Sequence, residues 1–123
     1  MKGFAVALGF VALAAISLGP ASAQSDTVEE TYKLYCVQCH GTAGNGQGVN
    51  QTAGALAVAP RDHTSAAQMS KIADEEIHLA ITKGGDAVQK SELMPGWGDI
   101  LSVKEIDELV IYLRKLCKCV AAK

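Results

Sequence analysis

Apolar residues recur at helical spacing in three stretches of this 123-residue chain. In the first, Val28, Tyr32 and Tyr35 stand at i, i+4 and i+7, which predicts one apolar helix face. Ser25 or Asp26 is the expected N-cap, and the acidic residues that follow suit the first turn of a helix. This helix is predicted to lead directly into the cysteine that follows Tyr35.

A second helix is predicted for residues 74–83. Its apolar stripe consists of Ile77, Ala80 and Ile81. Two glycines at positions 84 and 85 provide a C-terminal stop.

The third helix has the clearest start. Ser102 and Glu105 have the spacing of a capping box. Helical spacing continues through the apolar residues Ile106, Leu109, Val110, Leu113 and Leu116. The sequence has no long alternating run of β-branched and aromatic residues bounded by turns. The pattern therefore predicts an all-α domain.

The segment between the first and second helices is rich in glycine. Residues 41–54 contain five glycines, and residues 44–48 superficially resemble a phosphate-binding loop. Such a loop needs a preceding strand and a following helix, and neither is predicted here. We therefore expect a flexible loop whose glycines let the backbone approach a flat ligand. The small apolar run at residues 55–59 is expected to pack at the edge of that ligand.

The N-terminus has the features of a secretory signal peptide. Lys2 precedes an apolar run at residues 4–18, and Ala21-Ser22-Ala23 forms a cleavage pattern. This predicts a signal peptide at residues 1–23 and a mature domain at residues 24–123. An uncleaved anchor is the alternative, although the apolar run is shorter than the ~20 residues that span a bilayer. Either way the domain is exported, and the mature form is not expected to be embedded in a membrane.

Composition limits the class of partner. About 100 residues suit one small domain. Without Lys2, the mature chain has 10 basic residues (11 minus 1) and 13 acidic residues, a formal charge of −3. Nucleic acid is not an expected partner, because it attracts basic clusters.

Cys36, Cys39 and His40 form the Cys-x-x-Cys-His pattern by which haem is attached covalently. Thiols three positions apart lie on one face of a helical turn. Each can therefore form a thioether to one haem vinyl group, and an imidazole nitrogen of His40 can bind the iron. The alternatives are half of a zinc site or a redox dithiol. The adjacent histidine, the leader and the small domain favour one covalently bound haem c.

With this motif, the chain resembles the class I, or small monohaem, c-type cytochromes over essentially the whole mature region. The nearest group is the bacterial cytochrome c-553/c6-like or cytochrome c55X-like proteins. The resemblance is carried by residues 35–41 (Tyr-Cys-Val-Gln-Cys-His-Gly), the glycine-rich loop, Pro60-Arg61-Asp62, residues 93–98 (Leu-Met-Pro-Gly-Trp-Gly) and the last helix with Tyr112-Leu113.

The resemblance implies a small cytochrome c fold, in which three to five helices wrap the haem and the N- and C-terminal helices cross. It implies a periplasmic one-electron carrier rather than an enzyme. We expect a monomer that meets respiratory redox proteins through small transient contacts. Two other functions stay open: a gas-binding haem sensor with a labile distal ligand, and an accessory cytochrome dedicated to one reductase such as a nitrite reductase.

Met94 is the candidate for the second axial ligand of the iron. Methionine opposite histidine raises the reduction potential and keeps the iron six-coordinate. Pro95 limits the backbone conformations of Met94, and the resembling family places its methionine ligand in this loop. The alternative is a methionine that only fills core space. Met69, before the second helix, is expected to be a packing residue.

Three further residues are assigned to the cofactor. The resemblance suggests that the carbonyl of Pro60 accepts a hydrogen bond from the other ring nitrogen of His40. Arg61 can pair with a haem propionate or be an ordinary surface residue. Trp97 can pack near the haem edge or fill the core.

Four other residues carry ligand chemistry outside this scheme. His63 is expected in a solvated loop and His78 beside an apolar stripe, and both are only alternative iron ligands. Cys117 and Cys119 depart from the family pattern. Their open roles are a local disulfide, an intermolecular bridge, a lipid or metal attachment, an iron thiolate in place of methionine, or idle thiols. The last helix is expected to end near Leu116, because positions two apart face different sides of a helix.

Overall fold

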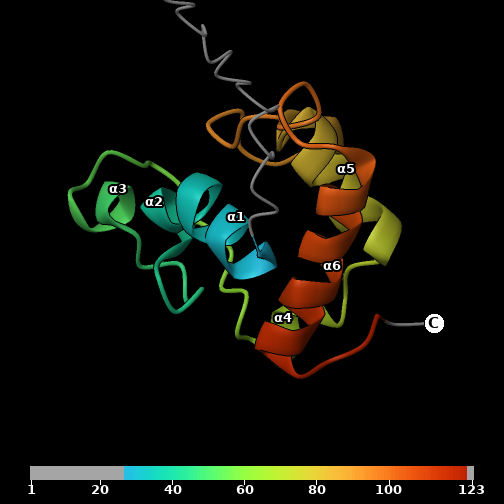
Figure 1. Ribbon diagram of the computed structural model, residues 1–123. Coiled ribbons are helices and arrows are strands. Elements are labelled where there is room, and N and C mark those ends of the chain that lie inside the picture. Colours follow the sequence, from blue (N-terminus) through green and yellow to red (C-terminus); the bar gives the residue numbers. More distant parts are fainter. Residues whose placement is uncertain (1–26, 122–123) are drawn as a thin grey trace, which may run out of the picture.

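The computed structural model describes residues 27–121, so the predicted signal peptide, residues 1–23, lies outside the described part. The described residues form helices and no strand: α1 (Val28–Tyr35), α2 (Val37–His40), α3 (Val49–Thr52), α4 (Ala66–Met69), α5 (Asp74–Lys83), the 3-10 helix η1 (Asp86–Val88) and α6 (Val103–Cys117) (Figure 1). The all-α prediction is confirmed. Six α-helices are found between residues 27 and 121, rather than three to five, because α2, α3 and α4 are single turns of four residues.

α1 begins with a capping box that differs from the predicted cap. Thr27, not Ser25 or Asp26, is the N-cap. The backbone N–H of Glu30 donates to Thr27 Oγ1 at 3.4 Å, and the backbone N–H of Thr27 donates to the Glu30 carboxylate at 2.8 Å. The Thr-x-x-Glu spacing that produces this arrangement is visible in the sequence. The prediction was wrong because it placed the helix start one or two residues too early.

α2 follows α1 directly, with Cys36 as the one residue between the two helices. Cys36 is at once the C-cap of α1 and the N-cap of α2. Its backbone N–H still donates to the carbonyl of Tyr32, as in a continuing helix. The predicted link between the first helix and the cysteine motif is therefore present, although the motif itself occupies the separate turn α2.

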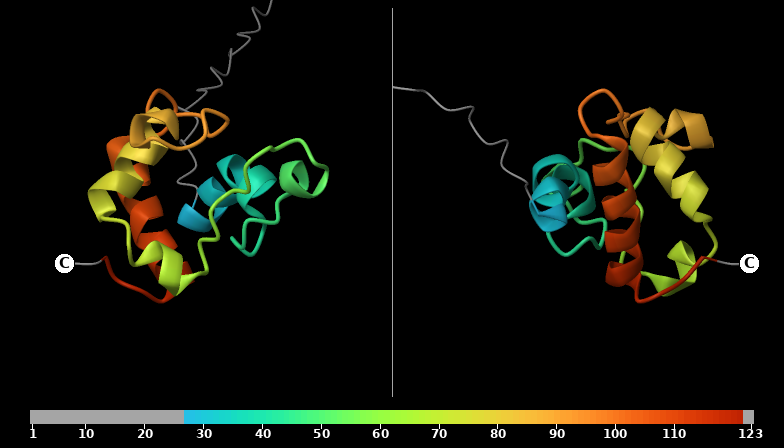
Figure 2. Two further views of the ribbon diagram at one scale, coloured as in Figure 1. Left: turned by 180° about the vertical axis from the view of Figure 1, so that it is seen from behind. Right: turned by 45° about the vertical axis from the view of Figure 1, so that its right-hand side comes forward.

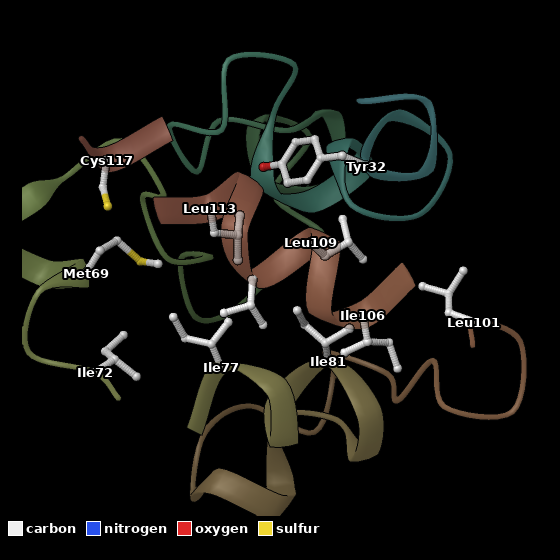
Figure 3. Packing of buried hydrophobic residues seen from close by; sticks show 11 residues of the cluster. Tyr32, Met69, Ile72, Ile77, Ile81, Leu101, Ile106, Leu109, Leu113 and Cys117 are labelled. Atoms are coloured by element: carbon white, nitrogen blue, oxygen red, sulfur yellow. The ribbon is translucent and has the colours of Figure 1, made fainter. Parts of the chain in front are cut away.

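α5 and α6 begin and end as their sequence signals predict. α5 has the predicted bounds and ends at Gly84, whose φ of 94° favours glycine. α6 begins at the Ser102–Glu105 capping box. In Figure 3, Ile77 and Ile81 of α5 point toward the buried side chains of α6. This contact forms the larger part of the hydrophobic core.

α1 packs across α6 on the side away from α5 (Figure 2). Tyr32, 2% exposed, is the main contact of α1, and its ring centroid lies 5.2 Å from that of Tyr112 on α6. The expected contact between the N- and C-terminal helices is thus present. α6 separates the α1–α2 segment from α5 and sets their spacing.

Arg114, in the last turn of α6, ties this helix to α4 and α5. Its side chain is 12% exposed. Its two terminal nitrogens donate to the carbonyls of Met69 at 2.7 Å and Ile72 at 2.6 Å. Its Nε donates to the Asp74 carboxylate at 2.7 Å. The planar guanidinium reaches the three acceptors with three separate nitrogens, whereas a lysine carries all its donors on one nitrogen.

Cys117 and Cys119 form a disulfide bond with each other. α6 ends at Cys117, close to the predicted end, and Lys118 turns the chain with a φ of 51°. That left-handed residue brings the two sulfurs to the same side. The structure therefore selects the local bridge among the roles left open, and neither sulfur lines the cavity described below.

Within residues 27–121, no helix combines the length and apolar character needed to cross a bilayer. The longest, α6, has 15 residues.

Replacement of Arg114 by lysine tests how much its three hydrogen bonds stabilise the fold. Arg114→Lys keeps the charge but leaves carbonyls of Met69 and Ile72 without their donors, so we expect the free energy of unfolding to fall by roughly 2–4 kcal/mol. Denaturant unfolding measures this loss. Lys115→Ala is the matched control, because its ion pair with Glu29 at 3.8 Å is solvent-exposed and should be worth less than about 1 kcal/mol. An equal fall in the free energy of unfolding of the two variants would contradict this role of Arg114.

Candidate functional site

A cavity of about 960 Å³ opens between the α1–α2 segment and the segment that runs from α5 through residue 97. Residues 56 and 58–63 line it at one margin, and Leu109 and Leu113 of α6 contribute to its wall. Its size falls in the range of pockets that hold cofactors. The core contact between α5 and α6 and the crossing of α1 over α6 together keep its walls apart.

Cys36, Cys39 and His40 all line this cavity. The short helix α2 and its cap place the three residues on one turn. Neither thiol is in a disulfide bond. Burial raises the pKa of the Cys36 thiol to about 12, and the Asn50 side-chain amide donates to the sulfur of Cys39 at 3.5 Å. The motif thus presents two thiols and an imidazole to one space.

The ring of His40 is fixed by a backbone carbonyl. Its Nδ1 lies 3.0 Å from the carbonyl oxygen of Arg61. The partner expected from the family resemblance, the carbonyl of Pro60, is therefore wrong by one residue. Burial lowers the pKa of His40 and outweighs the hydrogen bond to the Arg61 carbonyl, which acts in the opposite direction; the nearby Arg61 charge adds to the lowering. The neutral imidazole is the form that binds a metal, and its Nε2 is left to do so.

His63 differs most from its prediction. It was expected in a solvated loop, but only 8% of the residue is exposed. Its ring stacks on that of His40, with centroids 4.0 Å apart and planes 19° apart. Its Nδ1 lies 2.9 Å from the hydroxyl of Tyr32. Burial, with His40 and the Arg61 charge beside it, holds the pKa of His63 well below its usual range.

The glycine-rich segment makes close contacts within the protein. Gly44 and Gly46 have φ values of 75° and 78°, so they form turns that favour glycine. A side chain at Gly48 would collide with the backbone carbonyls of Gln38 and Cys39. Gly48 therefore lets the chain approach its own α2, whereas Gly44 packs beside Tyr32 and His63 and a Cβ at Gly46 would lie 2.7 Å from the Pro60 carbonyl oxygen. The expected approach of these glycines to a ligand stays a prediction. The expected flexible loop also contains a helix, α3.

Met94 and Trp97 line the opposite wall of the cavity. Their loop is hydrogen-bonded to the end of α5, because the N–H of Gly85 donates to the Met94 carbonyl at 3.0 Å and that of Trp97 donates to the Ile81 carbonyl at 2.8 Å. A Cβ at Gly96 would lie 2.7 Å from the carbonyl carbon of Lys83. The glycine thus permits the close contact that holds this loop in place.

The remaining candidates divide by position. Pro60 and Arg61 both line the cavity. Met69 lines it too, but is 1% exposed and belongs to the core cluster, in keeping with its expected packing role. His78 does not line the cavity: its Nε2 lies 3.4 Å from the Asp107 carboxylate, in a shallow groove between α5 and α6.

Residues 23–113 match the family described as cytochrome c oxidase, cbb3-type, subunit III. The chain belongs to this family. Among solved structures, the KustC0563 c-type cytochrome aligns with a TM-score of 0.58 and 25% sequence identity, covering 74% of this chain and 98% of that one. A comparison with curated proteins found no match.

The protein is therefore a small c-type cytochrome, and both the expected resemblance and the expected fold are confirmed. Cytochromes of this type carry electrons on a covalently bound haem c. The cavity of this cytochrome suits that group. Two thiols without a disulfide partner and an adjacent imidazole suit haem c attachment and ligation, and these residues line one cavity together with Met94.

Sequence reasoning missed His63 and Tyr32 as parts of this site. Tyr32 was visible as a member of an apolar stripe, but nothing in its spacing signalled a polar contact with a residue 31 positions away. His63 follows an arginine and an aspartate, a context that favours solvent. Only the turn through Gly44, whose carbonyl accepts from the His63 N–H at 2.7 Å, brings this histidine inside.

Gly48→Ala tests the contact between the glycine-rich segment and α2. The added methyl group would meet rigid backbone, so we expect the unfolding free energy of the haem-loaded cytochrome to fall by roughly 1–3 kcal/mol through overpacking. Gly54→Ala is the control: no atom lies within 4 Å of its Cβ, and only its φ of 73° is unfavourable, at about 1 kcal/mol. A loss for Gly48→Ala below that of Gly54→Ala would contradict the contact. Denaturant titration followed at the haem absorbance provides the measurement.

Proposed function

We propose that this cytochrome is a periplasmic one-electron carrier with a single haem c, attached through Cys36 and Cys39 and ligated by His40 and Met94. The observation that carries the proposal is that the two thiols, the imidazole and the Met94 thioether line one cavity from opposite walls. The single Cys-x-x-Cys-His motif of the sequence supports one haem rather than two. The group supplies one-electron chemistry at its iron, and the protein residues supply its attachment, ligation and surroundings.

His40 is oriented for ligation by its contact with the Arg61 carbonyl. The Arg61 carbonyl accepts from Nδ1, so the proton of the neutral ring is held on that nitrogen and the Nε2 lone pair stays available. A hydrogen bond of this kind also makes the imidazole a stronger ligand. Arg61 thus contributes through its backbone, whatever its side chain does.

The second ligand is Met94 rather than Met69. Both thioethers line the cavity, but Met69 is fully buried among core residues, whereas Met94 is half-buried on a loop. That loop is held by backbone hydrogen bonds to the end of α5, which fix the position of a flexible side chain. Methionine opposite histidine raises the reduction potential and closes the iron to small gases, as a carrier requires.

The surroundings support a buried cofactor with one exposed margin. Trp97 packs on Tyr35 with ring centroids 5.0 Å apart, which forms an aromatic wall. Val58 and Leu93, both more than half exposed, lie at the outer margin of the cavity. Arg61 also lines the cavity, and its guanidinium is the candidate partner of a haem propionate.

Export and partners complete the proposal. The signal-peptide pattern at residues 1–23 supports secretion to the periplasm. An exported domain is consistent with a c-type haem. The family description names a subunit of a cbb3-type oxidase, which makes a respiratory terminal oxidase a candidate redox partner. We expect a monomer that meets such partners through brief contacts at the exposed margin.

Carbon monoxide addition to the reduced, haem-loaded protein tests the ligand assignment. The wild-type optical spectrum should not change, because a bound methionine closes the iron. Met94→Ala should bind carbon monoxide promptly, and its reduction potential should fall by a sizeable part of the roughly 0.8 V that axial ligands span.

Met69→Leu is the matched control, since it removes the other thioether of the cavity with little change in volume. It should keep the wild-type spectrum and potential. Carbon monoxide binding by the wild-type protein would instead favour a gas-binding sensor. A Met94→Ala protein with unaltered spectrum and potential would show that Met94 is a packing residue.

A further inference from the structure

We propose that His63 is a positioning residue that sets the plane of the His40 imidazole, with Tyr32 as its support. The inference rests on the proposed function, because it takes His40 as a ligand of the haem iron. It goes beyond that function by adding a second histidine and a tyrosine to the machinery around the iron, neither of which binds it.

The need for such a residue follows from the torsions of histidine. The terminal torsion of a histidine side chain joins sp³ and sp² carbons and has a broad, shallow preference. The ring plane of His40 is therefore set by neighbours and not by its own rotamer. The hydrogen bond from Nδ1 to the Arg61 carbonyl fixes one point of the ring. The ring can still swing about that point.

The face of His63 removes this remaining freedom. The two rings are nearly parallel, at 19°, and their centroids are 4.0 Å apart. At this spacing the rings are in van der Waals contact, so any swing of His40 toward His63 meets repulsion. The carbonyl and the stacked ring together define both the direction and the plane of His40.

His63 can act in this way only because it is itself held. Its ring nitrogen Nδ1 lies 2.9 Å from the Tyr32 hydroxyl, and its backbone N–H donates to the Gly44 carbonyl at 2.7 Å. A Cβ at Gly44 would lie 3.2 Å from that hydroxyl, so the turn is packed closely against this pair. Tyr32 is anchored in turn by its packing on Tyr112 of α6. The support thus reaches from the last helix to the ligand.

The same geometry excludes His63 as the iron ligand opposite His40. Ligands on opposite sides of one iron need the macrocycle between them. Rings stacked at 4.0 Å leave no room for it. His63 therefore lies beside His40, and the proposal assigns its effect to that ring.

The orientation of an axial imidazole plane changes its π overlap with the iron orbitals. Loss of the orienting contact should therefore alter the electron paramagnetic resonance g values of the oxidised haem and its reduction potential. Residues that orient a metal ligand typically change site properties by about tenfold or more when they are removed. A tenfold change in the reduction equilibrium corresponds to roughly 59 mV for one electron.

Three variants of the haem-loaded, full-length protein separate the contributions. His63→Ala removes the stacked ring and should change the g values and shift the potential by about tenfold in equilibrium. His63→Phe keeps a flat ring over His40 and should stay closer to wild type. Tyr32→Phe removes only the hydroxyl that holds His63, and should give an intermediate shift.

His78→Ala is the control, because His78 contacts Asp107 in the groove between α5 and α6 and does not line the cavity. It should leave the g values and the potential unchanged. Thermal unfolding of each variant reports any purely structural effect. If His63→Ala does not fold, the g values and potential of Tyr32→Phe and His63→Phe are compared instead. A shift in Tyr32→Phe supports the positioning role, and wild-type values in it overturn the role.

Wild-type g values and potential in both His63→Ala and Tyr32→Phe, with or without a loss of thermal stability, would overturn the positioning role. The wild-type sample distinguishes this result from failure of the proposed function. If its mass and spectrum lacked a covalent, histidine-ligated haem, both proposals would fall. If the wild-type protein had a covalent, histidine-ligated haem and the variants kept its g values and potential, only the role of His63 would fall.

Discussion

The packing of Tyr32 against α6 is the contact on which the rest of this structure depends. Its ring is almost completely buried where α1 crosses α6, and this fixes the direction in which the chain leaves α1. The next turn, α2, carries two thiols and an imidazole, so the same contact decides where those three groups face. The Tyr32 hydroxyl then reaches His63, which stacks on His40. One side chain thus joins the hydrophobic core to the candidate haem ligand.

The opposite wall of the cavity is built by different means. α5 is held to α6 by apolar packing and by Arg114, whose guanidinium satisfies two carbonyls and a carboxylate. The Met94 loop is joined to the end of α5 by backbone hydrogen bonds. Glycines in this region permit the close approach of the two segments, because a side chain would collide with the neighbouring backbone. α6 lies between the two walls and sets their separation. The cavity is therefore a consequence of how two independent packings share one helix.

The polar groups around the cavity work by restricting one another. The Arg61 carbonyl fixes a nitrogen of His40, and burial with a nearby positive charge keeps that ring neutral. His63 is likewise neutral through burial, so two histidines can stack without repulsion between charges. Two solvent-exposed histidines would not be kept neutral in this way. Burial thus serves both the chemistry of the ligand and its orientation.

The sequence by itself determined what depends on near neighbours in the chain. The bounds of α5, the capping box of α6 and the grouping of Cys36, Cys39 and His40 on one turn all follow from spacings of a few residues. Only the tertiary structure decided what depends on distant residues. It buried His63 against a tyrosine 31 positions away and gave His40 a carbonyl 21 positions away, one residue from the expected Pro60. It also packed Gly48 against the backbone of α2. Such contacts arise where chain segments meet after folding, and no local period encodes them.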